Sequence, residues 1–333
     1  MLDRSASIFH HSRHRARHPE LSVVAPAFNE AAGLAAFHRR LVAAMEPLGT
    51  WEVLYVDDGS SDDTRAVLNG LRLTDARVAV IALSRNFGKE IATTAGLDHA
   101  SGDAVIVIDT DLQDPPETIP ALVAAWRDGF DMVNARRRRR DGDGWAKRTS
   151  AQAFYRLMRH AGRVKLPSDT GDFRLMSRRV VDAVRQCREQ HRFMKGLFAW
   201  VGFPTTTVLY DREPRHAGNG KWGWWSLWNL ALEGITGFTV MPLKVATYLG
   251  LAVALVSVVF GIQVIVKTLI FGNPVAGYPS LMTVILFLGG VQLVTLGVIG
   301  EYLGRVFNET KQRPLYLVDR YEPSREGIGM MGE

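Results

Sequence analysis

Acidic side chains gather at the end of one strongly apolar run. Residues 105–116 read VIVIDTDLQDPP, so four apolar residues lead directly into three aspartates and a glutamine. An apolar run of this kind predicts a buried strand of a parallel sheet. Asp109, Asp111 and Gln113 alternate along its end, and carboxylates this close repel each other unless a cation lies between them. Such hard oxygen ligands suit Mg²⁺ or Mn²⁺, which commonly binds one or two carboxylates and completes its shell with water and substrate phosphates.

A second acidic pair follows another apolar run. Asp57 and Asp58 precede a Gly-Ser turn in the string VDDGSSD. A carboxylate here could accept a hydrogen bond from the base or ribose of a nucleotide, and Ser60 or Ser61 could cap the helix that follows. The sequence contains neither a P-loop nor the glycine-rich dinucleotide fingerprint, which disfavours ATPases and dehydrogenases.

The first half of the chain alternates β-rich runs with amphipathic stretches. This alternation indicates an α/β fold of βαβ units around a mostly parallel sheet with right-handed crossovers. Strands are expected at residues 21–26, 51–58, 78–83, 104–109 and 131–135, and helices at 31–46 and 62–73. Four strands are followed by polar strings, which are PAFNE (26–30), DDGSSDD (57–63), SRNFGKE (84–90) and DTDLQD (109–114). Because ligands bind beyond the carboxyl ends of the strands in such sheets, the site is expected at that edge.

Two long apolar segments lie in the C-terminal third. Residues 245–271 contain one charged residue, Lys267, and residues 281–300 contain none. A span of about 20 apolar residues crosses a bilayer, and neither segment has amphipathic periodicity. Both are therefore predicted to be transmembrane helices rather than helices of a soluble core. The loop 272–280 lacks Lys and Arg, so the positive-inside rule places this loop outside and both termini in the cytoplasm.

The remaining composition fits a protein at a membrane in a reducing compartment. The 333 residues include 40 Lys and Arg against 34 Asp and Glu, a surplus that suits membrane surfaces or phosphorylated ligands. The single cysteine, Cys187, cannot form an internal disulfide. Residues 221–238 hold four of the eight tryptophans along an apolar helical stripe, which predicts an interfacial helix, with an ordinary core helix as the alternative.

These patterns divide the chain into five regions. They are a disordered basic tail (1–20), a catalytic domain (21–218), interfacial amphipathic helices (219–243), a transmembrane region of two helices (244–305) and a cytoplasmic C-terminal tail (306–333). The predicted location is the inner (plasma) membrane, with the catalytic domain and both termini in the cytoplasm. The basic tail has no apolar core, so it is not a signal peptide.

A run of five arginines, 136–140, directly follows the last predicted strand of the sheet. Arg136 is expected to reach the site because it stands at the strand end. Arg137 and the other three arginines are expected at the bilayer surface, where each basic residue contributes about 1 kcal/mol to binding anionic lipid.

Several longer strings resemble the inverting GT-A glycosyltransferases of family 2, and in particular their polyprenyl-phosphate branch. The strings are PAFNE, VDDGSSDDT, LSRNFGKE, DTDLQDPPE, TGDFRLMSR, RFMKGLFAWVGF, LALEGITGF and GEYLGR. The resemblance covers essentially residues 21–315; Asp63 departs from it at a turn where the family often has a small residue. It implies a Rossmann-like GT-A domain that transfers a sugar from a nucleotide-sugar donor to a polyprenyl phosphate.

The resemblance further implies which residues bind the substrates. Those expected at the nucleotide sugar are Pro26, Asn29, Glu30, Asp57, Asp58, Lys89 and Asp109. Asp58 is expected to read the uracil or the ribose. The metal on the donor diphosphate, Mg²⁺ or Mn²⁺, is assigned to Asp109, Asp111 and Gln113. Arg136, Lys147 and Arg148 match basic positions that hold the lipid phosphate.

The catalytic residues implied in the same way are Asp172, Asp111 and Arg174. Asp172, in the string GDF, matches a proposed catalytic carboxylate, and Arg174 is placed to orient it. A phosphate nucleophile is already largely anionic near neutral pH, so a strong base is less necessary than for a sugar hydroxyl. Asp172 is therefore expected to position the reactants or act as a weak base; a structural ion pair with Arg174 or Arg178 is the alternative.

Two other functions were weighed against this one. A processive polysaccharide synthase of the same fold carries a Q-x-x-R-W motif, which the nearest stretch, EQHRFMKG (189–196), lacks. A membrane-tethered binding protein with an inactive site would not need the intact Asp109, Asp111 and Gln113. The favoured donor is UDP-glucose and the favoured acceptor undecaprenyl phosphate, while UDP-galactose, UDP-N-acetylglucosamine and GDP-mannose stay open. The expected partners are the donor, the lipid acceptor and the membrane, with no nucleic acid and with a possible homotetramer.

Overall fold

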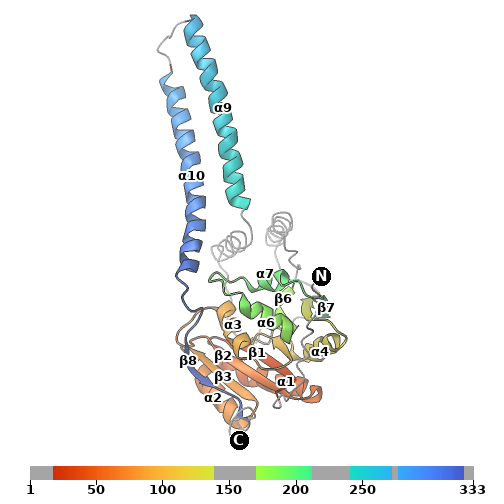
Figure 1. The fold of residues 1–333 in the computed structure, drawn as a ribbon. Coiled ribbons are helices and arrows are strands. Elements are labelled where there is room, and N and C mark those ends of the chain that lie inside the picture. Colours follow the sequence, from red (N-terminus) through yellow and green to blue (C-terminus); the bar gives the residue numbers. More distant parts are fainter. Residues whose placement is uncertain (1–17, 139–169, 212–240, 272–276, 326–333) are drawn as a thin grey trace, which may run out of the picture.

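The structure, a computed structural model, describes residues 18–138, 170–211, 241–271 and 277–325 (Figure 1). Of the interfacial helices predicted at 219–243, residues 219–240 lie outside these ranges, as do the basic residues Lys147 and Arg148. The strands are β1 (Leu21–Ala27), β2 (Trp51–Asp57), β3 (Val78–Leu83), β4 (Ala104–Val107), β5 (Met132–Arg137), β6 (Thr170–Ser177), β7 (Thr205–Tyr210) and β8 (Val318–Glu322). The helices are α1 (Ala31–Met45), α2 (Thr64–Thr74), α3 (Lys89–His99), α4 (Ile119–Arg127), α6 (Arg178–Gln186), α7 (Met194–Trp200), α9 (Met241–Phe271) and α10 (Tyr278–Thr310).

The strands form one mixed sheet in the order β7-β5-β6-β4-β1-β2-β3-β8. The central strands β4, β1, β2 and β3 run parallel to one another, as does the pair β5 and β7. Strand β6 is antiparallel to β4 and β5, and β8 is antiparallel to β3. The predicted α/β architecture of the GT-A type, with a mostly parallel sheet, is confirmed.

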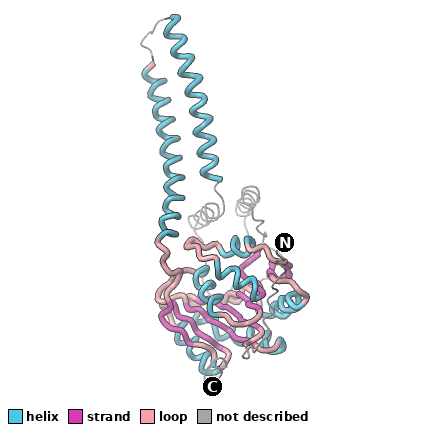
Figure 2. Tube along the Cα trace, viewed as in Figure 1, coloured by secondary structure: helices cyan, strands magenta, loops and turns pink. Residues whose placement is uncertain are grey.

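Helices cover both faces of this sheet (Figure 2). Residues of α1, α2 and α4 bury their apolar sides in one core, and residues of α3, α6 and α7 bury theirs in the other. Two hydrophobic cores form, one on each face of the sheet, because the central strands are apolar on both faces. Every residue of β1, for example, is buried. Helix α3 lies especially close to the sheet at Gly96, where a Cβ atom would be 2.2 Å from Val24 Cγ1.

The predicted strands and helices of the first half agree with the structure to within a few residues. Three further strands, β6, β7 and β8, had not been predicted. Strand β8 is the largest departure, because its residues had been assigned to a C-terminal tail. It lies beside β3, with Ile81 opposite Tyr321 and Val80 opposite Glu322, so the chain returns to the sheet after α10 (Figure 1).

Helices α9 and α10 project from the sheet domain as an antiparallel hairpin (Figure 1). Two stretches within them, Pro242–Gln263 and Phe287–Thr310, are long and apolar enough to cross a membrane, by length and composition. Their side chains are exposed rather than buried against protein. Both helices extend beyond the apolar segments predicted from the sequence, 245–271 and 281–300.

Candidate active site

The loops after β1 and β2 are joined by hydrogen bonds at the carboxyl edge of the sheet. Asn29 donates its N–H to Ser60 Oγ at 3.0 Å, and its Oδ1 accepts the N–H of Ser61 at 2.9 Å. Asn29 has a φ of 54°, a left-handed conformation that asparagine tolerates better than most residues. Gly59 also has a positive φ, 69°, and a Cβ atom there would lie 2.4 Å from the Arg85 carbonyl carbon. Asparagine at position 29 and glycine at position 59 therefore allow the loops after β1, β2 and β3 to pack against one another.

The two predicted nucleotide carboxylates are both buried and have different partners. Asp58 accepts the N–H groups of Phe87 and Gly88 at 2.8 and 2.9 Å, so it fixes the chain just before α3. Burial raises the pKa of Asp58 and the charge of Asp57 adds to this, although the two N–H donors oppose it. Asp57 accepts the N–H of Ser60 at 3.0 Å. Each carboxylate thus has a structural role in the loops where a nucleotide was predicted.

Pro26 and Glu30 support the same edge through their backbone atoms. The Pro26 carbonyl accepts the hydroxyl of Thr110 at 3.2 Å, which connects the end of β1 to the acidic segment after β4. The N–H of Glu30 donates to Thr64 Oγ1 at 2.9 Å. The predicted donor-side residues Pro26, Asn29, Glu30, Asp57 and Asp58 therefore lie on adjoining loops.

Lys89 bridges two of the predicted carboxylates. Its Nζ lies 2.6 Å from Asp109 Oδ2 and 2.6 Å from Asp172 Oδ2. The three residues come from the start of α3, the end of β4 and the middle of the chain at β6, so the fold gathers them from distant sequence positions. Lys89 remains 43% exposed, and the pair of carboxylates faces solvent in part. Lys89 thus supplies a cation between Asp109 and Asp172, a different pair from Asp109 and Asp111, for which the sequence predicts a metal ion.

Asp172 has a second cation nearby. Lys195 Nζ, on α7, is 3.7 Å from Asp172 Oδ1. Burial favours the neutral acid, but the charges of Lys89 and Lys195 outweigh it and hold the pKa of Asp172 below its ordinary range. Asp172 Oδ1 accepts no hydrogen bond from the described residues although it is buried. Asp172 is therefore an ionised carboxylate held between two lysines, with one buried oxygen that accepts no hydrogen bond from the described residues.

Arg174 is buried beneath this cluster and supports it through the backbone. Its guanidinium donates to the carbonyls of Gly171 and Asp172 at 2.8 and 3.3 Å and lies 4.0 Å from the ring centre of Phe198. Burial lowers the pKa of Arg174 to about 10. Arg174 thus contacts the backbone on either side of the Asp172 side chain, and its role in orienting Asp172 stays a prediction. The ion pair considered as an alternative for Asp172 forms with Lys89 instead of Arg174 or Arg178.

The predicted metal ligands surround a tight turn after β4. Asp111 Oδ1 accepts the N–H of Gln113 at 3.1 Å, and the intervening Leu112 is buried with a φ of 60°. Backbone strain of this kind persists only where the surroundings impose it. In the described ranges, no group of three or more His, Cys, Asp or Glu side chains is arranged to hold a metal.

The residues nevertheless fit a divalent cation shared with a substrate. Burial raises the pKa of Asp109, Lys89 opposes this, and the charge of Asp172 adds to it. Negative charge at this edge therefore exceeds what Lys89 neutralises. Asp109, Asp111 and Gln113 offer oxygen donors, and Mg²⁺ or Mn²⁺ commonly takes the rest of its shell from water and phosphate.

The structure brings a different arginine to the acids from the one predicted. Arg137 Nε lies 3.2 Å from the Tyr210 hydroxyl and Arg137 Nη2 lies 3.7 Å from Asp114 Oδ1. Tyr210 in turn donates to Asp114. Arg136 is exposed on the other side of the strand end. Neighbouring residues of a strand point to opposite faces, which explains why Arg137 rather than Arg136 lies near Asp114. The roles expected for Arg136 at the lipid phosphate and for Arg137 at the bilayer surface stay predictions.

Three site residues were missed from the sequence, namely Lys195, Glu90 and Tyr210. Burial, together with the charge of Asp172, raises the pKa of Glu90 to about 7, and Glu90 accepts the N–H of Met194 at 3.1 Å. Glu90 follows Lys89 directly in a polar string after a strand, a usable signal. Lys195 stands within the string RFMKGLFAWVGF, but nothing in its spacing indicates contact with Asp172.

Comparison with known proteins agrees with the class defined by this fold and site, an α/β glycosyltransferase of the GT-A type. Residues 22–185 match the family model described as glycosyl transferase family 2, and residues 241–306 match the GtrB C-terminal hairpin. The chain belongs to glycosyl transferase family 2.

Similar proteins match along nearly the whole chain. An uncharacterized glycosyltransferase of Synechocystis sp. is 53% identical over 90% of this chain and 94% of its own length. A bactoprenol glucosyl transferase of Shigella phage SfV is 50% identical over 90% of this chain and 98% of its own. A solved structure, mannosyl-3-phosphoglycerate synthase from Rubrobacter xylanophilus, has a TM-score of 0.45 and 19% identity over 65% of this chain and 71% of its own.

Proposed function

We propose that this protein transfers glucose from UDP-glucose to the phosphate of undecaprenyl phosphate, with inversion, at the cytoplasmic face of the membrane. The observation that carries the proposal is 50% identity to a bactoprenol glucosyl transferase over 98% of that protein's length. The apolar hairpin of α9 and α10 supports it, because a lipid acceptor requires an enzyme held at a membrane. The lack of Lys and Arg in residues 272–280 supports a cytoplasmic catalytic domain.

The site's own residues favour a reaction without a strong base. An acceptor phosphate oxygen forms the new bond to the anomeric carbon while the bond from that carbon to the donor diphosphate breaks, and UDP leaves. No proton has to be removed from the phosphate, because it is anionic near neutral pH. Asp172 suits this reaction, since a carboxylate whose pKa is held below its ordinary range is a poor base. The Asp172 side chain is 21% exposed, so its carboxylate can contact a substrate and orient it.

Cationic groups of the chain have a complementary role. Lys89 keeps Asp109 and Asp172 together at 2.6 Å each, which sets the spacing between the donor side and the sugar side of the site. Asp109, Asp111 and Gln113 would hold Mg²⁺ or Mn²⁺, which would neutralise charge developing on the diphosphate leaving group. Arg137 pairs with Asp114, which follows the acidic turn directly, and so adds positive charge beside the proposed diphosphate site.

The direct test uses the purified full-length protein in lipid nanodiscs. Radiolabelled UDP-glucose and undecaprenyl phosphate are added with Mg²⁺ or Mn²⁺, and lipid-linked glucose is separated by thin-layer chromatography. We expect one labelled monosaccharide-lipid, inverted at the anomeric carbon, and no polymer. UDP-galactose, UDP-N-acetylglucosamine and GDP-mannose are run in parallel, and preference for any of them overturns the choice of donor.

Metal removal tests the role assigned to the acidic turn. We expect EDTA to abolish transfer and an excess of Mg²⁺ or Mn²⁺ to restore it. Asp111→Asn should lower the rate about 100-fold at ordinary metal concentration, because one charged ligand is lost, and should raise the metal concentration needed for half-maximal rate. Full activity in EDTA would refute the metal-dependent mechanism while leaving the transfer reaction itself intact.

A further inference from the structure

Helix α7 contacts three groups of the site at once. Its first residue, Met194, donates its N–H to Glu90, which adjoins Lys89. One residue further on, Lys195 lies 3.7 Å from Asp172. Phe198, one helical turn on, packs against the guanidinium of Arg174 at 4.0 Å. A small displacement of α7 would therefore alter the charge and the backbone around Asp172 together.

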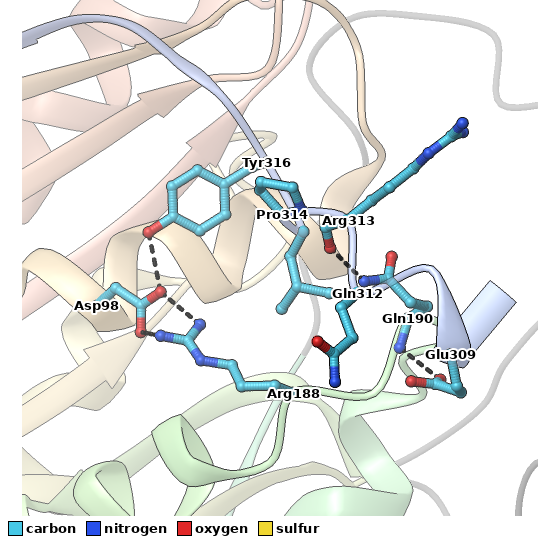
Figure 3. Close-up of a pocket in the computed structure, with 9 residues that line it drawn as sticks. Asp98, Arg188, Gln190, Glu309, Gln312, Arg313, Pro314 and Tyr316 are labelled. Carbon is cyan, nitrogen blue, oxygen red and sulfur yellow. Dashed lines mark hydrogen bonds and ion pairs between the residues drawn. The ribbon is translucent and has the colours of Figure 1, made fainter.

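The loop before α7 is attached to the end of the apolar hairpin. This loop, residues 187–193, joins α6 to α7. The N–H of Gln190 donates to Glu309 Oε1 at 2.7 Å, and the ring of His191 lies 3.0 Å from Asn308 Nδ2. The Gln190 side chain also donates to the carbonyl of Arg313. Figure 3 shows the contacts of Gln190 with Glu309 and Arg313, and all three residues line a pocket of about 640 Å³.

The segment after α10 also contacts the helix that carries Lys89. Tyr316 donates its hydroxyl to Asp98 Oδ2 at 2.8 Å, and Arg188 from the α6–α7 loop pairs with the same carboxylate at 2.8 Å (Figure 3). Asp98 lies near the end of α3, whose first residue is Lys89. The end of α10 and the residues after it thus contact both α3, which carries Lys89, and the loop that leads to α7, which carries Lys195.

We infer that the end of α10 and the α6–α7 loop form a coupling that holds α7, and with it Lys195 and Phe198, in the position that the site needs. Glu309 and Asn308 are positioning residues in this arrangement, because they touch the loop and not the reacting groups. The apolar hairpin then has a second role besides anchoring the enzyme. The position of α10 against the α6–α7 loop determines the geometry around Asp172. The inference uses the proposed function only for its kinetic readout.

The first experiment measures the coupling without any substrate. Hydrogen–deuterium exchange is followed in α7, residues 194–200, for the full-length protein in nanodiscs. Glu309→Ala should speed exchange in α7 about fivefold, since a hydrogen bond to a charged group is lost, and adding Asn308→Ala should speed it further. Glu309→Gln should restore the original rate, because its amide oxygen still accepts the Gln190 N–H. The matched control is Glu301→Ala, which removes a carboxylate from the same helix that pairs with Arg305.

The second experiment separates positioning from simple loss of stability. Glu309→Ala should lower kcat for glucose transfer about fivefold, leave the KM for UDP-glucose unchanged, and be rescued by Glu309→Gln. If exchange in α7 is the same in Glu309→Ala, in the double variant and in Glu301→Ala, the coupling is refuted. If exchange responds but the wild-type protein transfers no sugar to undecaprenyl phosphate, the proposed function fails and the coupling stands.

Discussion

Lys89 is the residue on which the acidic site most depends. It lies 2.6 Å from Asp109 and from Asp172, which would otherwise face each other without a cation from the chain between them. Its pKa is raised because these two negative charges outweigh the effect of burial, so it stays protonated throughout the physiological range. Removing one member of such a cluster leaves charges that the surroundings do not compensate.

Replacing Asp172 tests whether this carboxylate acts as a base. Because Lys89 and Lys195 hold its pKa below the ordinary value, Asp172 stays ionised from about pH 5 upward. Asp172→Asn should therefore lower kcat, by about 100-fold, without changing the pH at which the rate begins to fall on the acid side. The measurement is the pH–rate profile of both proteins at saturating substrates. Disappearance of an acid limb in the variant would assign the proton-accepting role to Asp172 after all.

His38 gives a pH dependence of stability far from the site. It is buried, its Nδ1 lies 3.0 Å from the Tyr55 hydroxyl, and its Nε2 lies 3.5 Å from Asp75. Burial lowers its pKa below the ordinary 6.5, although Asp75 opposes the shift. Below pH 6.5 the unfolded chain therefore protonates His38 more readily than the folded protein does. The free energy of unfolding is highest above pH 6.5 and decreases as the pH falls through the pKa of His38 in the folded protein.

The check compares thermal unfolding midpoints of wild type and His38→Gln at about pH 7.5 and about pH 5.5. Glutamine keeps an oxygen for the Tyr55 hydroxyl but does not titrate. The wild-type midpoint should fall more on acidification than that of the variant. Equal falls would mean that His38 is not responsible for the acid sensitivity.

At this scale the sequence indicated the acids better than their partners. Asp109 and Asp111 could be recognised because they follow an apolar strand, and Asp172 and Arg174 because their string resembles a family motif. Lys195 was missed because it lies 23 residues along the chain from Asp172 and meets it only through the packing of α7. The contact of Arg137 with Asp114 could not be predicted, because the face to which a strand residue points cannot be read within a run of identical residues.

Helix α3 lies close to the sheet at one glycine. Gly96 faces Val24, and a Cβ atom there would lie 2.2 Å from Val24 Cγ1 and 3.2 Å from Val56 Cγ2. Both valines are fully buried, so neither can move aside without disturbing the core. The close approach sets the distance between α3 and the sheet. It therefore also sets the position of Lys89, the first residue of α3.

Two glycine substitutions test this fit. Gly96→Ala should destabilise the protein by about 2 kcal/mol or more through overpacking, and should lower transfer activity because Lys89 is displaced. Gly70→Ala, in the exposed middle of α2, meets nothing within 4 Å and should stabilise by about 0.5–1 kcal/mol. Chemical unfolding of the two variants measures both effects. If Gly96→Ala behaves like Gly70→Ala, α3 does not depend on close contact with β1.

The strands differ in how readily a sequence can predict them. Strands β1 to β4 are buried on both faces and appear as continuous apolar runs, so they were predicted within a few residues. Strand β6 contains Asp172 and Arg174, and β8 reads VDRYE with most side chains exposed. Their strand conformation comes from pairing with β4, β5 and β3, which is information held elsewhere in the chain.

In the whole molecule, the polypeptide leaves the sheet domain, forms the apolar hairpin and comes back as β8 (Figure 1). Strand β8 covers the edge of β3, and Asp319 pairs with Arg65 of α2 at 2.9 Å. Beyond the strand, the N–H of Arg325 donates to the carbonyl of Ala76 at 2.8 Å. The C-terminal end of the hairpin is thus connected to the catalytic domain through the strand that follows it.

Truncation tests how much β8 contributes. A chain ending at residue 317 should unfold about 5 °C or more below the full-length protein and should aggregate, because the edge of β3 is uncovered. A chain ending at residue 325 keeps the strand and the contact with Ala76, and should match the full length. The readouts are the thermal midpoint and the fraction of monodisperse protein after purification. A stable, monodisperse chain ending at 317 would show that β8 is dispensable.

The position of β8 also fixes a sequence of events during synthesis. The ribosome synthesises strands β1 to β7 first and then α9 and α10, so residues 318–322 are added to the chain only after both helices. Until that moment β3 is an open edge, at which another nascent chain could pair. The catalytic domain can therefore be completed only after both apolar helices have been made, so chains interrupted between β7 and β8 lack a finished sheet.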